Sequence, residues 1–302
     1  MKSSLHKILF LSILPISLLI AETPNVPTQL DFSSLVDDFM EEGNVLKKTI
    51  NLSGKQRMLS QYMAKLTAQI SLNIQKDQSI VELKKISELY AKTLKAFSVG
   101  DSDLGIKSAT NAKVKEQIKV LEKEWKNFEE QIQLIISKKD KDAKALAYVL
   151  ENNEKLLASS NELVARYEAS NTSANYLEKA RLRVVNVAGR QRMLIEKMTK
   201  EKLLCVKSPQ KYNSKLKSTV KLFNDSLTTI IKGDSSKQIT KPSNPKIIKQ
   251  LKVISKLWEE LKPLYKKEKN SSKELAIIIA KNSTLLKEMN TMVELAEKEV
   301  EY

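Results

Sequence analysis

The chain carries one nine-residue pattern twice, and this duplication limits what it can fold into. Residues 51–59 read Asn-Leu-Ser-Gly-Lys-Gln-Arg-Met-Leu, and residues 186–194 read Asn-Val-Ala-Gly-Arg-Gln-Arg-Met-Leu. Further matches follow at a similar separation: Gly100-Asp101 with Gly233-Asp234, Trp125 with Trp258, and 153–164 with 282–293. A repeat period of about 130 residues predicts two similar domains rather than a solenoid. We place them at residues 32–170 and 173–301.

Each half reads as four long helices. No proline lies between Pro27 and Pro209, apolar residues recur at helical spacing, and no alternating run predicts a strand. The expected helices span about 32–76, 78–98, 109–138 and 140–170, then about 173–206, 209–232, 245–268 and 270–300. The junction at 170–174 either breaks the chain or lets the fourth helix run on into the fifth. The fold class is therefore all-α.

The N-terminus has the pattern of a secretory signal peptide. Lys2 and Lys7 precede the apolar stretch Ile8–Ile20, and Ala21 offers a small residue for cleavage. An uncleaved anchor is the alternative, but the stretch is shorter than the ~20 apolar residues that a bilayer core requires. We expect residues 1–21 to be removed and the mature protein to be soluble and periplasmic.

The supply of reactive side chains excludes most catalytic chemistry. The chain has one histidine, His6, inside the expected signal peptide, and one cysteine, Cys205, inside an apolar helical run. This excludes histidine-dependent catalysis, histidine-ligated metals and an internal disulfide from the mature chain. No carboxylate pair suggests a reaction either, so we expect no enzyme, cofactor or metal site, and a buried thiol at Cys205.

The formal net charge of +16 favours anionic partners. The lysines are scattered along the chain, however, so a solvated exterior explains most of the charge. Export and an aromatic content of only 5% argue against nucleic acid.

The repeated pattern gives its helix two faces. At about 100° per residue, Asn51, Gly54, Arg57, Met58 and Gln61 share an arc of roughly 120°, and apolar residues occupy another. A glycine inside a helix costs roughly 1 kcal/mol relative to alanine, and close approach of another backbone is the simplest reason for it. Arginine supplies planar donors for an oxyanion, which indicates an anion pocket. Alternatively, the glycine serves packing alone and the arginine pairs with a carboxylate.

Other repeated residues have structural interpretations. We expect Trp125 and Trp258 to be equivalent core anchors of the third helix in each half. Asn161 and Asn290 stand inside helices, where asparagine is intrinsically unfavourable, so we expect hydrogen bonds across the bundle.

The strings at residues 50–61 and 185–194 resemble the first-helix signature of the PilJ/NarX-like sensor domains. This family includes periplasmic input modules of nitrate/nitrite sensor kinases and of some chemoreceptors. The resemblance implies up-down four-helix bundles, in which two subunits pack their first helices together and hold one anion with an arginine from each. It implicates Arg57 and Arg192 as anion ligands, surrounded by these residues: Asn51, Gly54, Met58, Asn186, Gly189 and Met193.

An up-down bundle of four helices starts and ends at the same end. The two motif helices can therefore lie parallel in one chain, and we expect a monomeric pseudo-dimer with Arg57 and Arg192 facing one shared anion. Two departures stand out: Tyr62 replaces a basic residue that is frequent in the family, and Glu196 replaces Gln61. A carboxylate weakens an anion site unless it pairs with a cation, for which we expect Lys197 or Lys200.

Membrane-bound relatives continue into a transmembrane helix and a signalling domain, whereas this chain ends at Tyr302. The leading hypothesis is therefore a periplasmic sensory protein that binds a small oxyanion, such as nitrate or nitrite. It would act through a membrane receptor or sensor kinase. The alternative is a ligand-free adaptor that docks an acidic receptor or a pilus-associated complex.

Overall fold

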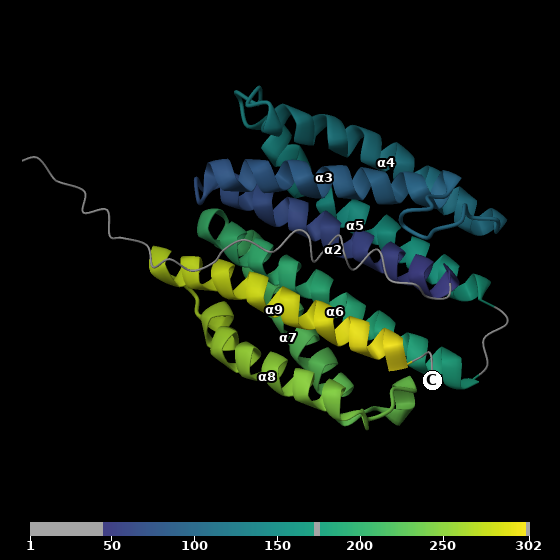
Figure 1. Cartoon of the computed structure of the whole chain (residues 1–302). Helices are drawn as coiled ribbons and strands as arrows, with labels where there is room; N and C mark the ends of the chain where they lie inside the picture. Colours follow the sequence, from purple (N-terminus) through teal and green to yellow (C-terminus); the bar gives the residue numbers. More distant parts are fainter. Residues whose placement is uncertain (1–44, 172–175, 300–302) are drawn as a thin grey trace, which may run out of the picture.

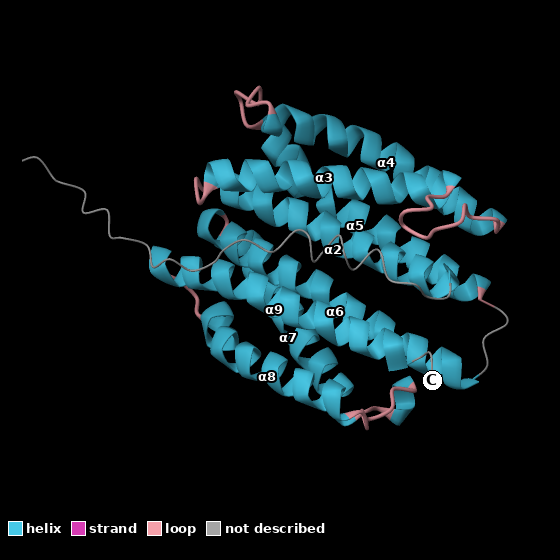
Figure 2. Ribbon diagram, viewed as in Figure 1, coloured by secondary structure: helices cyan, strands magenta, loops and turns pink. Residues whose placement is uncertain are grey.

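The computed structural model describes residues 45–171 and 176–299. The expected signal peptide and the first part of the expected first helix, residues 32–44, lie outside these ranges. Eight long helices dominate the described part, together with the short 3-10 helix η1 at Ser235–Lys237. The all-α prediction is confirmed (Figure 2).

The helices form two bundles of four, in which consecutive helices run in opposite directions (Figure 1). The first bundle contains α2 (Val45–Ser71), α3 (Lys76–Val99), α4 (Ala112–Ile136) and α5 (Lys144–Ser170). The second contains α6 (Tyr176–Lys207), α7 (Pro209–Lys232), α8 (Pro245–Lys266) and α9 (Ser272–Glu299). Asn171 leaves helical geometry, so α5 does not run on into α6.

Local residues explain where these helices begin and end. The side chains of Asn111 and Asn244 accept hydrogen bonds from the first backbone amides of α4 and α8, as good N-caps do. The prediction that the first helix reaches residue 76 was wrong. It ends at Ser71, because Asn73 and Gln75 turn the backbone to positive φ before α3 starts.

Gly100 and Gly233 end the second helix of each bundle in the same conformation. Their φ values are 85° and 76° and their ψ values are 161° and 164°, a region essentially restricted to glycine. The next residues form matching isolated bridges, Asp101 with Ile106 and Asp234 with Ile239. Within the described residues these bridges are the only extended pairing, so the duplication persists in the loops.

Gly233→Ala is expected to lower the free energy of unfolding by about 1–3 kcal/mol, the usual cost of this backbone region for other residues. An added Cβ would also lie 2.7 Å from the backbone nitrogen of Lys241. Chemical denaturation measures the change, with the neighbouring loop variant Ser235→Ala as control. Equal stability of Gly233→Ala and Ser235→Ala would contradict the expected backbone strain of a non-glycine residue at position 233.

The two tryptophans are equivalent core residues, as expected. Trp125 is 5% exposed and its ring centroid lies 4.4 Å from that of Tyr90; Trp258 is 2% exposed and lies 4.6 Å from Phe223. The backbone carbonyls of Tyr90 and Phe223 accept hydrogen bonds from Gln56 and Gln191 respectively. Each tryptophan cluster is thus tied to the motif helix of its own bundle.

The two bundles meet along α2 and α6, which lie side by side in Figure 1. Contacts between them connect Asn186 with Arg57, Lys200 with Gln61 and Lys207 with Ser71, so residue numbers rise together and the helices are parallel. Every residue of α2 from Leu52 to Ile70 is buried. The motif helix therefore lies at the centre of the molecule, and its polar face is covered by the other bundle. None of the described helices is long and apolar enough to cross a membrane.

Candidate functional site

The motif arginines lie buried where α2 meets α6. Arg57 and Arg192 are each 2% exposed. Arg57 folds back along its own helix, and its Nε lies 3.4 Å from the carbonyl oxygen of Gly54. The guanidinium groups thus lie one turn N-terminal to their own backbones, at the level of the glycines.

Each arginine donates a hydrogen bond to the motif asparagine of the other bundle. Arg57 Nη2 lies 2.9 Å from Asn186 Oδ1, and Arg192 Nη2 lies 2.8 Å from Asn51 Oδ1. Arg192 also donates through Nη1 to Asn290 Oδ1 at 3.3 Å. The two halves of the motif therefore complete each other across the junction between the bundles.

The glycines make room for guanidinium groups. A Cβ added to Gly54 would lie 3.1 Å from Arg57 Nη2, and one added to Gly189 would lie 3.4 Å from Arg192 Nη2 and 3.8 Å from Arg57 Nη2. The expectation of a close backbone approach was wrong, because the atoms nearest these positions belong to arginine side chains. Both arginine tips therefore lie within 4 Å of one point beside Gly189.

The electrostatic environment of this pair is strongly positive. Burial, then the charges of Arg190 and Arg192, lower the pKa of Arg57 to about 9, so the group remains charged at neutral pH. Glu168 acts in the opposite direction and is held by Asn186, whose Nδ2 lies 2.7 Å from its Oε1. The partly buried carboxylate of Glu168 thus interacts with the charges of Arg57, Arg190 and Arg183.

The remaining motif residues separate into different environments. Asn51 and Asn186 are half-buried at the arginine pair. Met58 and Met193 are buried in the hydrophobic core. Gln61, which shares the wheel arc of Arg57, instead contacts a second polar cluster further along α2.

That second cluster was not expected from the sequence. Lys65 Nζ lies 2.8 Å from Glu196 Oε2 and donates to Asn282 Oδ1 at 3.0 Å. The equivalent Lys200 donates to Gln61 Oε1 and Asn153 Oδ1, both at 2.7 Å. The contacts repeat across the junction because Lys65 and Lys200, like the arginines, are 135 residues apart. That spacing was the available signal.

The profile of the family described as "Type IV pili methyl-accepting chemotaxis transducer N-term" (PilJ) matches residues 42–171 and 176–280. The chain belongs to the PilJ family. The two matched segments contain one motif arginine each, so the resemblance read from residues 50–61 and 185–194 is confirmed. No curated protein sequence matches the chain. PilJ domains are periplasmic sensor domains linked to chemotaxis transducers and are typically non-catalytic.

One position breaks the symmetry of this PilJ pair. Glu196 is fully buried, and burial raises its pKa, while Lys65 acts in the opposite direction. The expectation that Glu196 pairs with Lys197 or Lys200 was wrong, because its partner is Lys65 from the other bundle. Lys200 instead pairs with Glu154 at 2.6 Å, and Lys197 reaches the same carboxylate at 2.5 Å. The carboxylate that pairs with Lys65 thus lies on α6, whereas the carboxylate that pairs with the equivalent Lys200 lies on α5.

Three other sequence expectations can now be placed. Tyr62, in place of a basic residue, donates to Glu82 and carries Lys65 Nζ at 4.0 Å from its ring centroid. Asn290 on α9 accepts a hydrogen bond from Arg192 on α6, so the bond expected across its own bundle is present. Asn161 is exposed, so the same expectation for Asn161 was wrong. Cys205 is buried, as expected, and burial raises the pKa of its thiol.

Glu154 gives the second cluster a defined pH response. Burial alone would raise its pKa, but the charges of Lys200 and Lys197 outweigh burial and hold the pKa at about 2. A depressed carboxylate pKa stabilises the fold above its ordinary value, and this stabilisation is lost as pH falls towards the folded-state value. The melting temperature of the wild type should therefore fall more steeply than that of Glu154→Gln between pH 4.5 and about 2. Glu151→Gln, an exposed change on the same helix, serves as control, and parallel curves for Glu154→Gln and wild type would refute the assignment.

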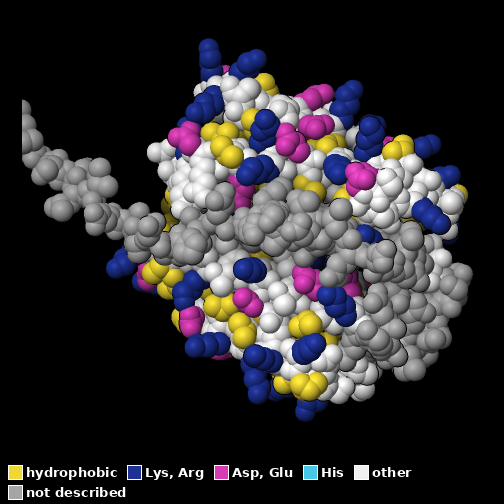
Figure 3. All heavy atoms as spheres, in the orientation of Figure 1, with side chains coloured by type: hydrophobic (Ala, Val, Ile, Leu, Met, Phe, Trp, Pro, Cys, Tyr) yellow, Lys and Arg dark blue, Asp and Glu magenta, His cyan; other side chains and the backbone are white. Residues whose placement is uncertain are grey.

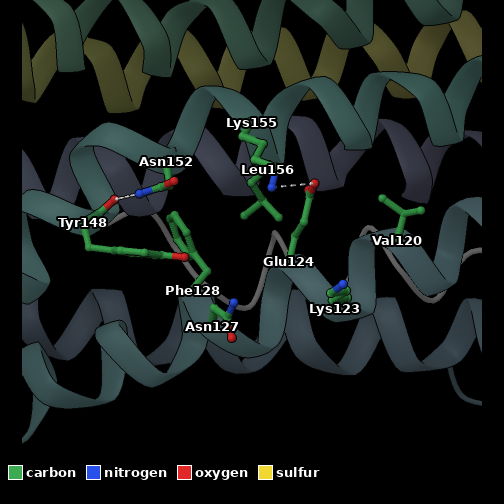
Figure 4. Close-up of a pocket in the computed structure, with 9 residues that line it drawn as sticks. All are labelled: Val120, Lys123, Glu124, Asn127, Phe128, Tyr148, Asn152, Lys155 and Leu156. Atoms are coloured by element: carbon green, nitrogen blue, oxygen red, sulfur yellow. Dashed lines mark hydrogen bonds and ion pairs between the residues drawn. The ribbon is translucent and has the colours of Figure 1, made fainter.

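Two cavities among the described residues differ in their relation to the arginine pair. One of about 390 Å³ reaches Asn186 and is also lined by Arg183, Arg190, Lys237 and Glu168. Another, of about 320 Å³, lies between α4 and α5 (Figure 4). Its Lys155 lies 3.6 Å from Glu124, so opposite charges meet within it. The first cavity is the better candidate for an anion path, because it brings cations next to the partner of Arg57.

Proposed function

We propose that the chain is a periplasmic sensory protein that binds one small oxyanion between Arg57 and Arg192 and acts through a membrane receptor or sensor kinase. The observation that carries the proposal is the pair of buried guanidinium groups whose tips lie within 4 Å of one point beside Gly189. Two like charges at this spacing repel each other in a poorly solvated site. A bound anion would offset that repulsion.

The shape of the site favours a small planar anion, with nitrate and nitrite as the first candidates. Guanidinium groups present coplanar donors that match planar oxyanions. The Oδ1 atoms of Asn51 and Asn186 already accept hydrogen bonds from Arg192 and Arg57. After reorientation of these side chains, their amide N–H groups would add neutral donors. The cavity at Asn186, with Arg183 and Arg190 on its wall, offers an approach from solvent.

The membership of the PilJ family supports the sensory role, and the intramolecular contact of α2 and α6 supports a complete site in one chain. Titration calorimetry at low chloride with nitrate and then nitrite tests both points. We expect saturable binding of one anion per chain. One anion per two chains would place the site between molecules instead.

Arg57→Ala and Arg192→Ala should each weaken anion binding roughly 10- to 100-fold, because a hydrogen bond to a charged group contributes about 1.5–3 kcal/mol. Arg166→Ala is the matched control, since Arg166 lies on the surface of α5 and pairs with Glu116 and Glu162. The proposal fails if both site variants bind every tested anion as well as the wild type.

An adaptor function without a small ligand is the second candidate. The observation that favours it is that Arg57 and Arg192 already donate to Asn186 and Asn51, so the junction is closed by its own side chains. In that case no oxyanion would produce heat or a thermal shift, and a receptor fragment would bind with or without added anion.

A further inference from the structure

A groove in the second bundle separates α7 from α8. Its volume is about 700 Å³, within the range of small-molecule sites. Its apolar floor is buried and consists of Leu216, Val220 and Tyr265. The polar lining residues are Asn213, Lys217, Lys221, Asn224, Lys262, Lys266, Lys267 and Glu268. Five ammonium groups and one carboxylate thus surround a partly apolar hollow.

Four of these lysines form two pairs of like charge. Lys217 and Lys221 are four residues apart on α7, and Lys262 and Lys266 are four residues apart on α8. Side chains at this spacing are neighbours on a helix surface, and like charges there destabilise an isolated helix. Both pairs line the same groove.

The first bundle is an internal control for this arrangement. With the separation of 133 residues that relates Trp125 to Trp258, Lys217 and Lys221 correspond to Lys84 and Glu88. Lys84 and Glu88 form an ion pair of 4.0 Å. By the same separation, Lys262 and Lys266 correspond to Glu129 and Gln133. The fold therefore does not require lysines at these places.

Neighbouring carboxylates compensate the groove only in part. Lys221 pairs with Asp225 at 2.5 Å, Lys262 with Glu259 at 3.8 Å and Lys267 with Glu274 at 2.7 Å. Lys217 and Lys266, in contrast, form no ion pair with any residue that the structure describes. Excess positive charge remains at the groove.

We propose that the α7–α8 groove binds a small organic or inorganic polyanion with at least two phosphate or carboxylate groups. Lysine ammonium groups bind such groups as point charges, and the facing pairs on α7 and α8 offer two anchoring positions. The buried floor accommodates an apolar portion of the ligand. This site is separate from the arginine pair, because it lies between α7 and α8 rather than between α2 and α6.

Calorimetric titration of the full chain with tripolyphosphate and with citrate tests the proposal. We expect one saturable site per chain for at least one probe. Lys221→Glu/Lys262→Glu, which restores the residues of the first bundle, should weaken binding at least tenfold. Lys249→Glu/Lys256→Glu is the matched control, because it changes the net charge equally at exposed lysines of α8 outside the groove.

The outcomes separate specific binding from general attraction. Equal weakening by the two double variants would show that only net charge matters and would overturn the proposal, as would the absence of binding by both probes. Should the Lys221→Glu/Lys262→Glu variant lose its helical circular dichroism, Lys217→Ala/Lys266→Ala decides instead. That change removes the two lysines that form no ion pair with a residue in 45–171 or 176–299, and unchanged affinity would again overturn the proposal.

Discussion

Replacing Lys65 with methionine is expected to lower the free energy of unfolding by about 3–5 kcal/mol, the usual cost of removing one partner of a buried ion pair. The change leaves the carboxylate of Glu196 at 0% exposure without its cation. It also removes the hydrogen bond to Asn282. Denaturant unfolding followed by circular dichroism measures the effect.

The double variant Lys65→Met/Glu196→Met separates the ion pair from the packing of these side chains. Apolar residues of similar volume often replace a buried pair with little loss of stability. We therefore expect the double variant to recover most of the stability that the single variant loses. A Lys65→Met protein within 1 kcal/mol of wild type would refute the role of the pair.

Trp258→Ala should lower the free energy of unfolding by a similar amount, about 3–5 kcal/mol, because it removes a large core side chain. Trp258 is 2% exposed, contacts Phe223 and Tyr265, and donates to Asn224 at 3.2 Å. Trp258→Phe, which retains an aromatic ring, should cost less. Equal losses for the two variants would contradict the packing argument.

The same tryptophan variant reports whether the two bundles unfold together. The junction buries α2 completely from Leu52 to Ile70, so the first bundle would expose its central helix if the second unfolded. We expect Trp258→Ala to reduce amide protection in α3 and α4 as well as in α7 and α8. Normal hydrogen-exchange protection in the first bundle would show that the bundles are energetically independent.

The fold was largely predictable because its signals are local. Helical spacing, the prolines at 209 and 245 and the paired glycines at 100 and 233 mark the helices and their ends. The end of α2 was missed because nothing at Asn73 and Gln75 requires positive φ in the sequence alone. The duplication indicated two bundles. Because an up-down bundle of four helices starts and ends at the same end, the two motif helices begin at the same end of the molecule.

The site was predictable only where residue type narrows the possibilities. Arg57 and Arg192 were singled out by the repeated motif and by the family resemblance. Their partners were not, since the reciprocal bonds to Asn186 and Asn51 depend on how the two bundles dock. Lys65 was not singled out, because a helix buried on all sides cannot be distinguished from a half-exposed one by its charges. The packing of the two bundles against each other decides both the partners of the arginines and the burial of Lys65.

The fusion of the two bundles permits a kind of divergence that a homodimer lacks. In a homodimer every substitution appears on both sides of the axis, so a glutamate at this junction would occur twice. Here Glu196 is sealed inside the protein at 0% exposure, whereas Glu154, which serves the opposite lysine, is 40% exposed. One flank of the junction is thus isolated from solvent, whereas the other is in contact with it. The two flanks therefore differ in their exposure to solvent, a difference that two identical subunits related by a twofold axis could not have.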